Sequence, residues 1–123
     1  MNKKLLQANL VMKEISWKEF EKVEIRVGTI LEVDDFPEAR NPSYKITIDF
    51  GPEIGIRKSS AQLTALYSKE DLIGKQILGV VNFKEKQIAN FMSECLTTGV
   101  YLSEKEVVFI SPERKVPNGL KLL

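Results

Sequence analysis

The feature that most constrains the fold of this chain is a strict alternation of apolar and polar residues over positions 44–50. The apolar positions fall on one side of an extended segment and the polar ones on the other: Tyr44, Ile46, Ile48 and Phe50 against Lys45, Thr47 and Asp49. Successive side chains of a β-strand point to opposite faces, so this pattern predicts a strand with one buried face. The chain therefore needs a sheet or barrel around this strand.

The neighbouring segments supply the rest of a small barrel. Ser16 and Glu19 form a capping-box pattern that predicts a short helix through about residue 23. Strands are predicted at 24–36, with a bend or bulge at Gly28, and at 54–58, while a helix capped by Ser59 or Ser60 is predicted over 61–67. Further strands follow at 76–83, 92–102 and 107–110. Three strands, a helix and two or three more strands are the order of an OB-fold, a mainly β, five-stranded Greek-key barrel with its helix between strands 3 and 4.

Length and composition limit the organisation of the chain. At 123 residues, the chain is expected to hold a short N-terminal extension, 1–14, and one barrel domain, 15–123. No apolar run approaches the roughly 20 residues of a membrane span, and a single cysteine cannot form an intramolecular disulfide, so a cytoplasmic protein is expected. Cys95 is expected to be a small buried hydrophobe.

The chain contains no histidine, which argues against several kinds of chemistry. A Ser-His-Asp or Cys-His arrangement cannot form, and a zinc site of cysteine and histidine ligands is excluded. The sequence also lacks a phosphate-binding glycine loop. We therefore expect a protein that is not an enzyme and that has no cofactor or metal. With a net charge of only +1, any nucleic acid must bind a local patch.

Such a patch is indicated at the end of the strand predicted over 76–83. Asn82 and Phe83 are followed by Lys84 and Lys86, and then by the pair Ser93–Glu94. An aromatic ring can stack on a base, and ammonium groups can contact phosphates. A hairpin with solvated lysines has a similar sequence, and Phe83 taken alone is expected in the core.

Two other positions have both a functional and a structural interpretation. Lys58 and Ser59 could form a phosphate seat at a helix N-terminus, or they could be an exposed lysine and an ordinary N-cap. The guanidinium of Arg26 could reach a phosphate or hold Glu24 or Glu94 in place.

Several blocks in sequence order resemble a known family. They are FEKVEIRVGTI, FPEARNPSYKITIDFG, KSSAQLTALY, LIGKQILGVVNF, KQIANFMSE and VPNG. They are similar to the CsaA-type proteins of the tRNA-binding domain family, which also includes endothelial monocyte-activating polypeptide II. The chain departs from the family where SEC replaces SEG or SEV, and where KEK replaces a proline-containing turn.

The resemblance implies an OB-fold homodimer that binds tRNA largely through its structure, with the N-terminal helix and the VPNG tail as candidate dimer contacts. The residues expected to bind tRNA are Arg26, Lys45, Lys58, Ser59, Asn82, Lys84, Lys86, Ser93 and Glu94. The CsaA branch also implies an export-related chaperone that binds unfolded polypeptides. In that alternative an apolar groove is expected to include Phe83, Ile88 and Phe91.

Overall fold

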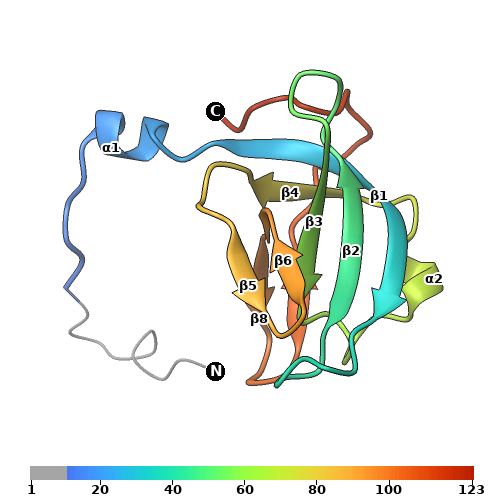
Figure 1. Cartoon of the computed structure of the whole chain (residues 1–123). Coiled ribbons are helices and arrows are strands. Elements are labelled where there is room, and N and C mark those ends of the chain that lie inside the picture. The colour runs from blue at the N-terminus through green and yellow to red at the C-terminus, as the bar shows by residue number, and fades with distance from the viewer. Residues whose placement is uncertain (1–10) are drawn as a thin grey trace.

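A long first strand organises the computed structural model, which describes residues 11–123. β1 (Ile25–Asp35) pairs along its C-terminal half with β2 (Tyr44–Asp49) and along its N-terminal half with β4 (Gln76–Val80). β3 (Ile56–Ala61) and β7 (Leu96–Thr97) complete one antiparallel sheet in the order β3-β2-β1-β4-β7. The sheet curls into a nearly closed barrel (Figure 1), which confirms the predicted mainly β, OB-like fold.

Smaller elements surround this sheet. Two short helices are α1 (Trp17–Glu21) and α2 (Lys69–Leu72), and neither is long or apolar enough to cross a membrane within residues 11–123. One hairpin consists of β5 (Lys86–Ile88) and β6 (Phe91–Ser93), and another of β8 (Gly99–Tyr101) and β9 (Val107–Phe109).

The core confirms the alternation that begins at residue 44. Tyr44, Ile46 and Ile48 are buried, and Phe50 is completely buried just beyond β2. The predicted irregularity in the first strand exists, but it lies between Ile30 and Glu32 rather than at Gly28. Gly28 has a packing role instead, because a Cβ there would lie 2.8 Å from the ring of Phe50.

The barrel closes along a seam between β3 and the segment that follows β6. The Glu94 amide donates to the Lys58 carbonyl at 2.7 Å, and the Lys58 amide donates to Oε1 of Glu94 at 2.9 Å. Deeper in the seam, the Thr97 hydroxyl donates to the Ser59 hydroxyl at 3.0 Å. A carboxylate side chain therefore takes the place of a backbone acceptor in the closing ladder.

The helix between β3 and β4 is present but lies later than predicted. Residues 64–66 form a turn within the irregular segment 62–68, and α2 begins at Lys69 behind a Ser68 capping box. The prediction of a helix over 61–67 was wrong because Ser59 and Ala61 point inward as alternate residues of β3. Consequently no helix N-terminus lies at Lys58, and the predicted phosphate seat there is not formed.

α1 lies beside the C-terminal residues (Figure 1), and the two segments line a common hollow. α1 begins with the predicted capping box of Ser16 and Glu19. The C-terminal segment runs along β1, where the Gly119 amide donates to Val27 at 2.8 Å and the Leu122 amide donates to Ile25 at 2.8 Å. Residues 1–10 of the predicted extension 1–14 lie outside the described residues.

Candidate nucleic-acid interface

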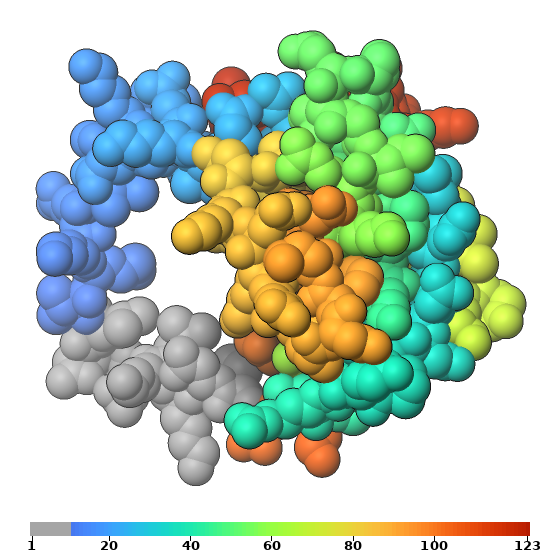
Figure 2. Space-filling model, viewed as in Figure 1, coloured from blue at the N-terminus to red at the C-terminus, as the bar shows by residue number. Residues whose placement is uncertain are grey.

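A hollow of about 520 Å³ opens where the end of β3 meets the loop after β4 and the β5–β6 hairpin. We call it the groove. Its lining consists of Ser60, Gln62, Phe83, Lys84, Lys86, Ile88, Ser93, Cys95 and Leu96. Figure 2 shows this hairpin, in yellow and orange, over the face of the barrel next to the green strands. The groove thus combines cations, apolar side chains and hydroxyls from segments far apart in the sequence.

The cationic side of the groove comes from Lys84 and Lys86. Both side chains are exposed, and neither forms an ion pair within residues 11–123. Lys86 lies directly opposite Ser93 in the β5–β6 ladder. The Ser93 hydroxyl accepts from the Ser60 amide at 3.4 Å and donates to the Cys95 carbonyl at 3.2 Å, so it joins the hairpin to the barrel wall. The structure therefore brings these three predicted residues together.

The apolar side of the groove includes an exposed aromatic ring. Phe83 is 58% exposed, so its expected place in the core was wrong. The β4 strand ends at Val80, and Phe83 lies in the loop beyond the last core position. Ile88 lies on the same groove, which leaves two apolar side chains beside the two lysines.

Phe91 and Lys45 lie outside the groove lining and pack against each other elsewhere. The ring of Phe91 meets that of Phe36 edge to face at 5.4 Å between centroids. The Lys45 ammonium lies 5.0 Å from the Phe36 ring centre and 5.7 Å from that of Phe91. This cation–aromatic cluster fastens the β5–β6 hairpin to the barrel.

Two residues at the end of β3 that were predicted to bind tRNA, Lys58 and Ser59, differ in their exposure. Ser59 is completely buried, and its hydroxyl donates to the Ser60 carbonyl at 3.3 Å. Its side chain therefore does not belong to the exposed surface. The Glu94 carboxylate accepts from the Lys58 backbone amide at the seam, while the Lys58 side chain is exposed and is not part of the groove lining, so its contact with tRNA stays a prediction.

Arg26 holds the C-terminal segment rather than Glu94. Its guanidinium donates to Oε1 of Glu24 at 2.8 Å and to the Gly119 carbonyl at 2.9 Å. The hydrogen bonds that Arg26, and then Lys121, donate to the Glu24 carboxylate hold its pKa below its usual range. Of the two carboxylates proposed as partners from the sequence, the structure selects Glu24.

Cys95 has the buried position that was expected. Burial raises the pKa of its thiol to about 12, and the thiol lies 3.7 Å from the Lys58 carbonyl. A thiol with this pKa stays protonated near neutral pH, so it lines the groove as a neutral apolar group.

A family model described as "Putative tRNA binding domain" matches residues 25–121. This match includes every strand from β1 to β9. The chain belongs to this tRNA-binding domain family.

Two solved structures are similar to this chain in sequence and in fold, and a methionine–tRNA ligase is similar to it in sequence. The chaperone CsaA from Bacillus anthracis is 41% identical, with a TM-score of 0.85 over 90% of this chain and 100% of that one. The CsaA chaperone protein from Picrophilus torridus is 46% identical, with a TM-score of 0.82 over 89% and 100%. Methionine–tRNA ligase from Pyrococcus furiosus is 32% identical over 111 residues, which are 90% of this chain but only 15% of the ligase.

In this member of the tRNA-binding domain family, Asn82 fastens α1 to the barrel. Its side-chain amide donates to the Lys22 carbonyl at 2.7 Å, and its oxygen accepts from the Glu24 amide at 3.0 Å. Both ends of the amide are therefore engaged at the junction between α1 and β1, away from the groove lining.

We expect Asn82→Ala to destabilise this junction by about 1–2 kcal/mol because two hydrogen bonds are lost, while tRNA affinity stays nearly unchanged. Trp17 is the only tryptophan in the chain and lies in α1, so its fluorescence during urea unfolding reports the change. If Asn82→Ala instead unfolds like the wild type but binds tRNA more weakly, Asn82 contacts the RNA, as the sequence predicted.

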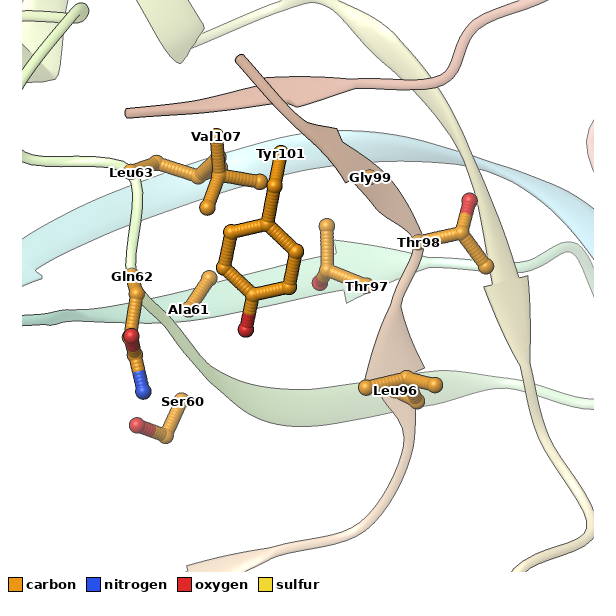
Figure 3. A pocket seen from close by; sticks show the side chains of 10 residues that line it. All are labelled: Ser60, Ala61, Gln62, Leu63, Leu96, Thr97, Thr98, Gly99, Tyr101 and Val107. Carbon is orange, nitrogen blue, oxygen red and sulfur yellow. The ribbon is translucent and has the colours of Figure 1, made fainter. Parts of the chain in front are cut away.

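A second hollow of about 370 Å³ shares Ser60, Gln62 and Leu96 with the groove and extends to Tyr101 and Val107 (Figure 3). Sequence reasoning missed Gln62, because it lay in the expected helix. It also missed Tyr101, because no local pattern relates β8 to the end of β3. The KSSAQLTALY block, one of those that carry the resemblance to the family, was the available signal for Gln62.

Proposed function

We propose that this protein binds tRNA through the groove and catalyses no reaction. The observation that carries the proposal is the exposed ring of Phe83 beside the ammonium groups of Lys84 and Lys86, which form no ion pair with any residue from 11 to 123. A ring offers a stacking surface to any base, and ammonium groups neutralise phosphates. Membership of the tRNA-binding domain family supports tRNA as the nucleic acid.

The charge balance of the chain favours a local interface. With a net charge of +1, most of the surface does not attract RNA, and the acidic residues of β1 lie away from the groove lining. We infer modest affinity per site with a strong dependence on salt, since a few phosphate contacts supply most of the attraction.

A second surface supports a homodimer. Trp17, which is 64% exposed, lines a hollow of about 290 Å³ together with Phe20, Val23, Leu122 and Leu123. Apolar side chains gathered where α1 meets the C-terminal residues are typical of an interface between subunits. Two groove sites in one dimer would strengthen the binding of one RNA that spans both. We place this dimer in the cytoplasm, where tRNA is used.

The alternative function is that of an export-related chaperone for unfolded polypeptides. It is favoured by the apolar lining from Phe83, Ile88 and Leu96, and by the similarity to CsaA chaperones. A polypeptide held by apolar contacts would bind with little dependence on salt and with a negative heat-capacity change. Phe91, the third residue predicted for this role, lies outside the groove lining.

The test is a salt series of tRNA binding by fluorescence anisotropy, with a denatured polypeptide titrated in parallel. We expect the logarithm of the tRNA association constant to fall linearly with the logarithm of salt, by about 0.7–0.9 units for each phosphate contacted. Binding of the polypeptide alone, even at low salt, would establish the chaperone function in place of tRNA binding.

A further inference from the structure

Gln62 lies where three hollows of the surface meet. It lines the groove, the second hollow that reaches Tyr101, and a third one between Asn41 and Lys105. The side chain is exposed, and its amide makes no hydrogen bond to any residue in the part of the chain that the structure describes. A side chain with one free donor group and one free acceptor at the centre of a recessed surface is suited to a ligand with complementary polar edges.

Exposed apolar and aromatic surface flanks this amide. Tyr101 is 60% exposed and Leu96 46% exposed, although both line the recess. Figure 3 shows the polar ends of Ser60, Gln62 and Tyr101 directed to the same side of the hollow. A flat ring could therefore lie against Tyr101 or Leu96 while its edge faces Gln62.

We propose that Gln62 reads the edge of an unpaired adenine in bound RNA, with Tyr101 providing the stacking surface. The proposal rests on the proposed tRNA binding and extends it to a class of nucleotide. The base must be unpaired, because a paired and stacked base cannot place its edge and its face in a recess at once. The neighbouring Lys84 and Lys86 would hold the phosphates of the same strand.

Adenine fits the amide and the recess better than uracil. A glutamine amide places an N–H donor beside a carbonyl acceptor, and adenine presents the complementary N6 donor and N7 acceptor. Its N1 and N6 form an equivalent pair on the other edge. Adenine thus offers two matching edges and a purine ring for stacking, whereas uracil offers one matching edge, formed by N3–H and O4, and a smaller ring.

The experiment compares oligoadenylate and oligouridylate of equal length by anisotropy, with bulk tRNA as a third ligand. We expect the protein to bind oligoadenylate about fivefold or more tightly than oligouridylate. Gln62→Ala should remove this preference and leave oligouridylate binding nearly unchanged. Gln62→Glu should also remove it, because a carboxylate keeps the size of the side chain but offers no donor. Both variants should fold, since the side chain is exposed and makes no hydrogen bond to the described residues, 11–123.

Gln87→Ala is the matched control, because Gln87 is exposed on β5 but outside the groove lining. It should retain the adenine preference. If tRNA binds but the two oligonucleotides bind equally, or if Gln62→Ala keeps the preference, the inference fails and the proposed function stands. If an unfolded polypeptide binds and no RNA does, both fail together.

Discussion

Replacing Phe50 by alanine is expected to lower the free energy of unfolding by about 3–5 kcal/mol. Phe50 is completely buried, and its ring fills the space left by two glycines on neighbouring strands. A Cβ at Gly28 would lie 2.8 Å from this ring, and one at Gly79 would lie 2.7 Å from it. No nearby side chain can expand into the cavity without leaving its own position, so the loss should approach the upper end of that range. Urea unfolding followed by circular dichroism measures it.

A double-mutant cycle tests whether the ring and the glycine form one packing unit. Gly79→Ala alone should cost about 1–3 kcal/mol, because the new methyl group overlaps the ring of Phe50. Combined with Phe50→Ala, it should cost clearly less than the sum of the two, since the cavity accepts the methyl group. Strictly additive costs would mean that Gly79 is required for another reason, such as the approach of the Leu96 carbonyl.

The same packing explains why much of the fold was predictable from the sequence. The alternation that begins at Tyr44 determines which face of β2 is buried, and the other strands follow from short apolar runs with turns between them. The Ser16 capping box was also predictable because it involves residues three apart. The helix after β3 was misplaced because Ser59 and Ala61 look like a helix start but alternate inward along a strand.

The candidate site was predictable only where its residues are close in sequence. Lys84, Lys86 and Ser93 lie within one hairpin and its loop, and the structure brings them to one groove. Asn82 was predicted to contact RNA, yet its partners at Lys22 and Glu24 are about sixty residues away in the chain. Such long-range hydrogen bonds leave no local pattern, so a polar residue that fastens two elements looks the same as one that binds a ligand.

Replacing Lys84 and Lys86 together by glutamine is expected to weaken tRNA binding by about tenfold or more at low salt. Each lysine that contacts a phosphate contributes about 0.7–0.9 to the salt slope, so the slope should become less steep by about 1.4–1.8 units. Glutamine keeps most of the side-chain length and hydrogen-bonding capacity, which leaves charge as the main change. The salt series is measured by anisotropy on the wild type and the double variant in parallel.

The matched control is Lys18→Gln with Lys75→Gln, which makes the same change in net charge at exposed positions outside the groove lining. If attraction to the protein as a whole governed binding, both double variants would weaken it equally, because long-range attraction depends on total charge. If the phosphates instead contact the groove, only the variant at Lys84 and Lys86 should change the salt slope of tRNA binding. An equal effect of the two pairs would therefore remove the groove from the proposed function. A change in polypeptide binding with no change in tRNA binding would assign these lysines to the chaperone alternative, since the tRNA would then have to bind elsewhere.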